Sequence, residues 1–285
     1  MTATIIDGNA IARGIRADLT VRVAALRERA VVPGLAVIVA GDDPASQVYV
    51  RTKAKACAEV GVAVQVKTFP AGVGADEVLA EIARLNADPA VHGILLQLPL
   101  PRGLDAARIA RAIDRAKDVD GFDPCNLGAL IAGGTAFEPC TPQGIMRMLG
   151  ASGIGIAGRT AVVVGRSAIV GKPIALMLLN ANATVTVCHS QTPALARHTR
   201  RADILVVAAG KPGLLRAPMV KPGAVVVDVG IHRLADGRLV GDVDFEAVRE
   251  RAGYITPVPG GVGPMTVAAL IGNTVLAAER ASSER

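Results

Sequence analysis

The sequence predicts an α/β protein of two domains, each built around a parallel sheet. Three observations support this prediction. The chain has 285 residues, which is enough for two domains of ordinary size. Hydrophobic residues make up 51% of it and aromatic residues only 2%, so the core must consist of Ala, Val, Leu and Ile, as suits strands buried on both faces. Apolar runs also alternate with helical patterns along almost the whole chain.

The first half of the chain reads as a βαβ series. The strand candidates are LAVIVA (35–40), VAVQVKTF (62–69) and GILLQLPL (93–100), and helical patterns are expected at about 46–60, 75–87 and 105–115. A loop rich in turn-forming residues, KDVDGFDPCN (117–126), follows the last of them. Alternation of this kind indicates parallel strands connected by helices.

A second α/β series begins near residue 140. The segment TPQG (141–144) predicts a helix start, with Thr141 as N-cap and Pro142 at the first helical position. An Asp-Gly turn in LADGRLVG (234–241) predicts a hairpin, and a final helix is expected from about Met265 to Arg280. The expected strands are 160–165, 184–189, 203–209 and 224–230.

These patterns predict two domains with an active-site cleft between them. The first is an α/β domain at 1–139, completed by the C-terminal helix at 267–285. The second is a Rossmann domain at 140–266.

Charge and composition argue against several classes of protein. The net charge of +6 is dispersed, and the basic cluster RHTRR (197–201) reads as the solvated end of a helix, so no nucleic-acid partner is expected. The uncharged stretch 252–278 is interrupted by PVPGGVGP and predicts a buried loop and core helix, not a membrane span. The N-terminus has no signal-peptide pattern. Four scattered cysteines predict reduced thiols in the cytoplasm and no metal site.

A nucleotide site is predicted where the second series begins. In AVVVGRSAIVGKP (161–173) a buried strand runs into Gly165, Arg166 and Ser167 and then into a helix. Glycine lets the backbone approach a pyrophosphate, and the helix N-terminus stabilises its charge. The spacing differs from GxGxxG, so a plain tight turn between strand and helix is the alternative.

The next strand predicts which nucleotide binds. An NAD site usually has an acidic residue after this strand, but the chain offers Ser190 there and Arg166 in the glycine loop. Arginine suits a phosphate, so NADP is expected. A helix N-cap ahead of Pro193 is an equally good reading of Ser190. Ile231, in VGIHR, follows a later strand and is a candidate backbone contact to the nicotinamide side.

Eight motifs in order carry a family resemblance. They are YVRTKAKAC, GILLQLPLP, KDVDGFDPCN, PCTPQG, VVVGRSAIVGKP, TVCHSQT, KPGAVVVDVGI and TPVPGGVGPMT. Together they resemble the bifunctional methylenetetrahydrofolate dehydrogenase/methenyltetrahydrofolate cyclohydrolase family of bacteria. The resemblance implies NADP-dependent oxidation of 5,10-methylenetetrahydrofolate, hydrolysis of the methenyl product to 10-formyltetrahydrofolate, and a homodimer formed through the cofactor domains. It also implies a place in one-carbon metabolism, serving purine, methionine and histidine biosynthesis.

The resemblance assigns roles to four residues of the first domain. Tyr49 matches the tyrosine that stacks on the folate, and Lys53 the lysine that handles protons during hydrolysis. Gln97 matches the amide that hydrogen-bonds this lysine, and Asp120 the carboxylate that binds the pterin edge. The residues alone also fit a lysine stem lying along an amphipathic helix, a structural amide, and an Asp-Gly turn.

The motif PGGVGPMT (259–266) is implied to border both ligands. Gly261 would allow close backbone approach, and Pro264 and Thr266 would begin the last helix. The chain departs from the family at Asp123, where many relatives have His. A dehydrogenase with little cyclohydrolase activity and a non-catalytic folate- or nucleotide-binding protein are the alternative functions.

Overall fold

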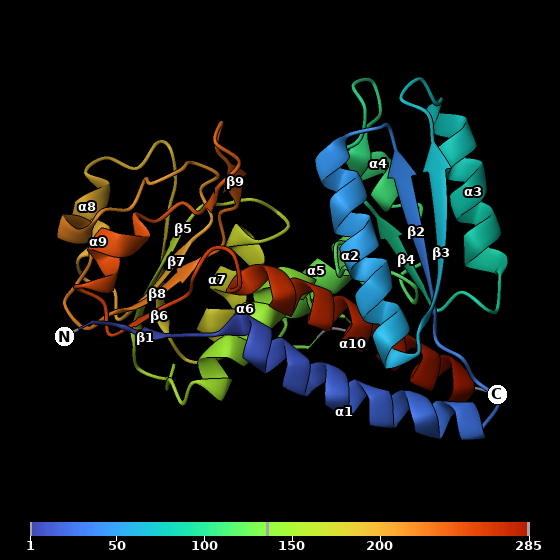
Figure 1. Cartoon of the computed structure of the whole chain (residues 1–285), viewed down its shortest axis with the longest axis horizontal. Coiled ribbons are helices and arrows are strands. Elements are labelled where there is room, and N and C mark those ends of the chain that lie inside the picture. Colours follow the sequence, from blue (N-terminus) through green and yellow to red (C-terminus); the bar gives the residue numbers. More distant parts are fainter. Residues whose placement is uncertain (1, 135–136, 284–285) are drawn as a thin grey trace. The chain divides into compact units, whose positions relative to one another are not determined.

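The computed structural model describes residues 2–134 and 137–283 and divides into two compact units (Figure 1). Gly14–Cys140 and Val267–Arg285 form one, called here the three-stranded unit. Met1–Arg13 and Thr141–Thr266 form the other, the six-stranded unit. The expected boundaries place residues 1–13 with the first series of strands, whereas in the structure they group with the second.

The three-stranded unit has a parallel sheet in the order β3-β2-β4. Alternate residues of β2 enter two different cores. Val37 packs in a cluster with helices α1 (Gly8–Glu28), α2 and α10 (Val262–Ser283). Ile38 packs in a cluster with α3 and α4. This strand is therefore buried on both faces, as its unbroken apolar sequence predicts. The elements are β2 (Gly34–Ala40), α2 (Pro44–Val60), β3 (Ala63–Phe69), α3 (Ala75–Ala87), β4 (Gly93–Leu96), α4 (Ala106–Ala110) and α5 (Pro124–Ile131).

Helix α2 has clear signals at both ends. The Asp43 carboxylate accepts a hydrogen bond from the Ser46 backbone amide at 2.8 Å, and Pro44 occupies the first turn. Gly61 ends the helix in the left-handed region, with φ of 93°, and its N–H donates to the carbonyls of Cys57 and Ala58. These caps fix which residues of α2 face the sheet.

The six-stranded unit has its parallel strands in the order β1-β11-β8-β7-β5-β6. After β5 the chain builds β6 on one side and then crosses to β7 on the other. Its strands and shorter helices are β1 (Thr4–Ile5), β5 (Thr160–Val164), α7 (Gly171–Asn180), β6 (Thr184–Cys188), α8 (Leu195–Thr199), β7 (Ile204–Val207), η1 (Ala217–Met219), β8 (Val225–Asp228), α9 (Phe245–Arg249) and β11 (Tyr254–Ile255). The predicted Asp-Gly hairpin is confirmed as β9 (His232–Arg233) and β10 (Leu239–Val240).

The remaining helices are α1 (Gly8–Glu28), α6 (Cys140–Ala151) and α10 (Val262–Ser283). Among the described residues, α10 is the one helix long and apolar enough to cross a membrane, but 67% of its apolar window is buried inside the protein. This burial confirms the predicted core helix. The last two residues of the range expected for it, 284–285, lie outside the described part of the chain.

Several local predictions were wrong at element ends. Helix α6 begins at Cys140, so Thr141 lies inside its first turn instead of capping it. The strand expected at 93–100 ends at Leu96, because Pro99 cannot donate to a sheet. The loop expected at 117–126 ends early, since Pro124 already starts α5. Strands β1 and β11 were missed, because two residues carry no readable alternation.

We expect Gly121→Ala to destabilise the protein by about 2 kcal/mol or more. Gly121 has φ of 77°, and a Cβ there would lie 2.7 Å from the Pro139 nitrogen. Gly128→Ala is the matched control, because Gly128 lies in α5 and a Cβ there would have no heavy atom within 4 Å. That change should stabilise by about 0.5–1 kcal/mol. Denaturant unfolding measures both, and equal effects would contradict the prediction.

Candidate active site

Tyr49 and Lys53 lie one helical turn apart on α2, so their side chains share one face of the helix. The Tyr49 side chain is 40% exposed, which leaves its ring accessible to a planar ligand. Lys53 is half-buried, whereas Lys55 is exposed. The helix thus presents an aromatic ring and an amine side by side.

Gln97 follows the carboxyl end of β4 and fixes the amine. The Lys53 Nζ donates to Gln97 Oε1 at 3.0 Å, and Gln97 Nε2 donates to the Leu98 carbonyl at 2.7 Å. Both ends of the amide are therefore engaged, so its oxygen must face the lysine. Gln97 is only 9% exposed, and its side chain is an oriented, buried acceptor.

Asp120 brings a carboxylate to the same cluster. Burial raises its pKa to about 6, against the opposing effects of the Lys53 charge and a hydrogen bond with the Cys140 thiol. The neighbouring Asp118 charge raises the pKa further. Asp120 is therefore an ionised acceptor at neutral pH that is easily protonated in mild acid.

Cys140 and Asn273 support the Asp120 loop, and sequence reasoning missed both. Asn273 Nδ2 donates to the carbonyls of Val119 at 2.8 Å and Glu138 at 3.0 Å, and lies 3.7 Å from the Cys140 sulfur. Burial, together with the Asp120 charge, raises the pKa of the Cys140 thiol well above its ordinary value, so it stays a neutral donor. The sequence did contain a signal for Asn273, because a polar amide in the mostly apolar helix α10 must find hydrogen-bond partners when it is buried.

The other two aspartates of the loop are structural. Asp118 accepts hydrogen bonds from the backbone amides of Phe122 and Asp123 and from Asn126 Nδ2, and these bonds hold the turn. Asp123 caps α5 by accepting from the Cys125 amide at 2.8 Å. Asp123 thus has a local helix-capping task at the position where many relatives are expected to have His.

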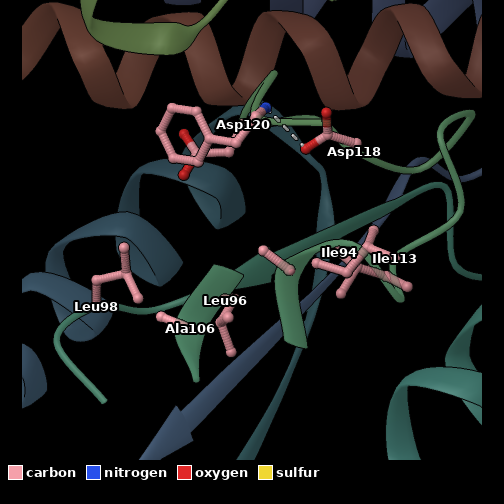
Figure 2. Close-up of a pocket in the computed structure, with 9 residues that line it drawn as sticks. Ile94, Leu96, Leu98, Ala106, Ile113, Asp118 and Asp120 are labelled. Carbon is pink, nitrogen blue, oxygen red and sulfur yellow. Dashed lines mark hydrogen bonds between the residues drawn. The ribbon is translucent and has the colours of Figure 1, made fainter. Parts of the chain in front are cut away.

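A small cavity lies against Asp118 and Asp120, and Figure 2 shows the apolar side chains that line it, among them Leu96, Leu98 and Ile113. Its volume of about 30 Å³ is room for a water or two, far below an ordinary ligand pocket. This cavity is therefore too small to hold a planar ligand.

In the six-stranded unit, Gly165 occupies the point where the strand order reverses. It follows β5 with φ of 130°, and a Cβ there would collide with the Ala208 carbonyl after β7. Ligands of open parallel sheets bind at this edge, outside the carboxyl ends of the strands. A Cβ on Gly171 would in turn collide with the Gly165 carbonyl, so this position also requires glycine.

The side chains around this edge are open to solvent. Arg166 and Ser167 are exposed in the glycine loop, where Ser167 Oγ also accepts from the Val170 and Gly171 amides at 3.2 Å. Ser190 is exposed after β6, and Ile231 is 44% exposed after β8. Ser190 is not a helix N-cap, because α8 starts after Ala194 without a side-chain cap. The alternative reading of Ser190 was wrong.

The segment 259–266 is tightly packed. A Cβ on Gly261 would lie 2.6 Å from the Pro257 carbonyl oxygen, so packing alone requires glycine there. Pro264 and Thr266 lie in the first turns of α10, which begins at Val262. The hydroxyls of Thr266 and Thr141 are 2.9 Å apart.

Two family models match the chain. The model described as "Tetrahydrofolate dehydrogenase/cyclohydrolase, catalytic domain" matches residues 6–120, and the "NAD(P)-binding domain" model of the same family matches residues 139–282.

Relatives match along nearly the whole length. The bifunctional protein FolD of Nitrosospira multiformis is 59% identical over 281 residues, covering 99% of this chain and 98% of that protein. The crystal structure of the bifunctional FolD dehydrogenase/cyclohydrolase of Campylobacter jejuni has 50% identity and a TM-score of 0.96, covering 98% and 99% of the two chains. The Trypanosoma brucei dehydrogenase-cyclohydrolase, solved with NADP and an inhibitor, has 44% identity and a TM-score of 0.96, covering 99% of each chain.

Replacing Lys53 with Met should raise the pKa of Asp120 above about 6, because the Lys53 charge is the largest influence that lowers it. The carboxyl carbon signal of Asp120, followed by NMR from neutral into acidic solution, measures the change. Lys55→Met is the matched control, since Lys55 is exposed on the same helix. A titration of Asp120 that is the same in both variants would contradict the electrostatic coupling.

Proposed function

Because the chain belongs to the tetrahydrofolate dehydrogenase/cyclohydrolase family, we propose that the Lys53–Asp120 cluster binds and hydrolyses the folate, while the glycine loop binds NADP. The protein oxidises 5,10-methylenetetrahydrofolate with NADP and hydrolyses the methenyl product to 10-formyltetrahydrofolate. The assignment of these tasks to residues rests on the geometry of each unit. It also keeps the expected functional division, with folate bound by residues 1–139 and 267–285 and NADP bound by residues 140–266.

The hydrogen bond from Lys53 Nζ to Gln97 Oε1 carries the assignment of the hydrolytic site. One N–H of the amine donates to a fixed acceptor, and this bond orients the other positions around the nitrogen. A neutral amine held this way keeps its lone pair available for a proton. Lys53 is therefore the proposed catalytic base and Gln97 its positioning residue.

Hydrolysis then needs one proton acceptor and one donor. As water attacks the methenyl carbon, a C–O bond forms and Lys53 Nζ takes a proton from the water. The Lys53 ammonium then returns this proton to N5 as the bond from that carbon to N5 breaks. The hydroxyl on the carbon releases its proton to solvent, so that a formyl C=O remains on N10.

Asp120 and Tyr49 hold the substrate in the proposed arrangement. The Asp120 carboxylate accepts hydrogen bonds from the donor edge of the pterin, which are strong because the acceptor is ionised. The Tyr49 ring, 40% exposed one turn before Lys53, stacks on the folate. These two contacts place the one-carbon bridge beside the amine.

The residues of the six-stranded unit fit NADP. The glycine loop passes so close to the Ala208 backbone that Gly165 cannot carry a Cβ, and exposed Arg166, Ser167 and Ser190 supply a guanidinium and two hydroxyls at this edge of the sheet. NADP, when bound, supplies the acceptor for the hydride. The chain's own part in oxidation is orientation, in which we include the Ile231 backbone and Gly261, Pro264 and Thr266, without an acid or base.

We also propose a homodimer formed through the six-stranded unit. Strand β6 is the edge strand of its sheet and carries Val187, which is 40% exposed. Helix α7, which packs against β6, carries Leu179, which is 54% exposed. An unpaired strand edge bordered by apolar residues favours association with a second copy.

We also propose a cytoplasmic location for the protein. The proposal is supported by the four free cysteines, three of which are buried.

Lys53→Met should lower the rate of hydrolysis of methenyltetrahydrofolate by about 100-fold or more, the usual worth of a general base. The loss of methenyl absorbance measures it, and oxidation of methylenetetrahydrofolate with NADP, run alongside, should fall much less. Lys55→Met should leave both reactions unchanged. A Lys53→Met protein that hydrolyses the substrate normally would remove Lys53 from its proposed role.

Leu179→Lys should weaken the dimer by about ten-fold or more, because a charge would be buried at the interface. Sedimentation velocity over a range of concentrations measures it. Val21→Lys is the matched control, since Val21 is 71% exposed on α1, in the three-stranded unit. If the two variants associate equally well, the interface lies elsewhere.

A further inference from the structure

A buried carboxylate in the six-stranded unit collects four hydrogen bonds. Asp242 is fully buried just after β10. Its Oδ2 accepts from the backbone amides of Ala209 at 2.6 Å and Gly210 at 2.9 Å. Its Oδ1 accepts from the Lys211 amide at 2.8 Å and lies 2.8 Å from His232 Nε2. Both oxygens are thus engaged with donors from other segments.

The donors belong to two loops at the ligand-binding edge of the sheet. Residues 209–211 follow β7, and His232 follows β8, the strand that pairs with β7. The same edge carries Gly165, whose backbone approaches Ala208. Asp242 therefore joins the loops that end two neighbouring parallel strands, where such sheets bind nucleotides.

A second carboxylate holds Asp242 in place. Asp228, at the end of β8, accepts from the backbone amides of Gly230 at 3.0 Å, Asp242 at 2.9 Å and Val243 at 2.9 Å. Glycine is required beside each acid, because a Cβ on Gly230 would collide with Asp242 and one on Gly241 with Asp228. The backbone thus packs directly against both carboxylates.

These contacts lie beyond the ladders of the sheet, so they fix loop positions and add nothing to strand pairing. Ile231 and His232 show most clearly how these contacts fix the position of a loop. The His232 side chain is tied to Asp242, while the adjacent Ile231 side chain remains 44% exposed. Anchoring one residue presents its neighbour to solvent at a fixed place.

We propose that Asp242, aided by His232, is a positioning residue that sets the loops 209–211 and 229–232 for NADP, and that it serves oxidation but not hydrolysis. This rests on the proposed binding of NADP at this edge. Asp242 need not touch the cofactor, since it acts through the backbone it holds. Oxidation needs those loops ordered, whereas hydrolysis uses the amine and carboxylate of the three-stranded unit.

The decisive variant is Asp242→Asn, which keeps the shape but turns an amide NH₂ toward backbone N–H donors. NADPH should bind about ten-fold more weakly or worse in calorimetry, as expected for losing one or two charge-assisted hydrogen bonds. In the cofactor-free protein, amides 209–211 should exchange hydrogen faster. In steady state the KM for NADP should rise more than kcat falls. Hydrolysis of methenyltetrahydrofolate without NADP should stay within about two-fold of the parent rate.

Matched variants separate positioning from general stability. Asp203→Asn removes a similar carboxylate, which accepts from the Thr160 amide at 2.9 Å and Lys221 Nζ at 2.6 Å, before β7 at the opposite end of the strands. It should leave NADPH affinity unchanged. His232→Ala should weaken NADPH binding, and His232→Gln, which retains a donor, should restore much of it.

Two results would overturn the proposal: Asp242→Asn binding NADPH as tightly as the parent protein, or losing oxidation and hydrolysis in equal measure. If Asp242→Asn fails to fold, the His232→Ala and His232→Gln pair decides by the same measurements. Absence of hydrolysis in the parent protein would count against the proposed function, while NADPH affinity and amide exchange would still decide the role of Asp242.

Discussion

Burying a carboxylate is costly unless hydrogen-bond donors surround it, and each of the two candidate sites contains a carboxylate that the protein compensates to a different extent. Asp242 accepts hydrogen bonds from three backbone amides and a histidine, so both of its carboxylate oxygens are paired within the protein. The described partners of Asp120 are one thiol and the charge of Lys53, and burial raises its pKa to about 6. A carboxylate whose oxygens are fully hydrogen-bonded within the protein holds the surrounding backbone in place. A carboxylate with fewer donors is stabilised more by a ligand that brings N–H or O–H groups.

The Lys53 cluster shows how a parallel sheet makes such a site. Gln97 lies directly beyond β4, where the chain has left the hydrogen-bond ladder but is still buried. A polar side chain at that place must find a partner, and α2 supplies the amine one turn after an exposed aromatic ring. Burial of the sheet thus explains both features: residues within the strand are apolar, and a polar residue just beyond its end must form hydrogen bonds within the protein.

The sequence predicted most of the architecture because strands buried on both faces are unbroken apolar runs, as in β2, β5, β7 and β8. Its motifs also led to Tyr49, Lys53 and Asp120 as candidate site residues. It missed the two-residue strands β1 and β11, whose pairing joins residues 250 positions apart, Thr4 with Tyr254. Asp242 was missed for a related reason, since its donors lie about 10 and 30 residues earlier and nothing in GDVDF reveals them.

That pairing of distant residues has a consequence for biosynthesis. The six-stranded sheet places β11 between β1 and β8, so its N-terminal strand has no neighbour until residues 254–255 have left the ribosome. The core of the three-stranded unit likewise includes Ala269, Leu270 and Val275 from the last helix. Neither unit can therefore finish folding before the residues of β11 and α10 have been synthesised, in contrast to the usual order in which an N-terminal domain is completed first. A nascent chain that stalls before residue 254 would expose apolar surface from both units at once, so prompt synthesis of β11 and α10 limits the time in which it can aggregate.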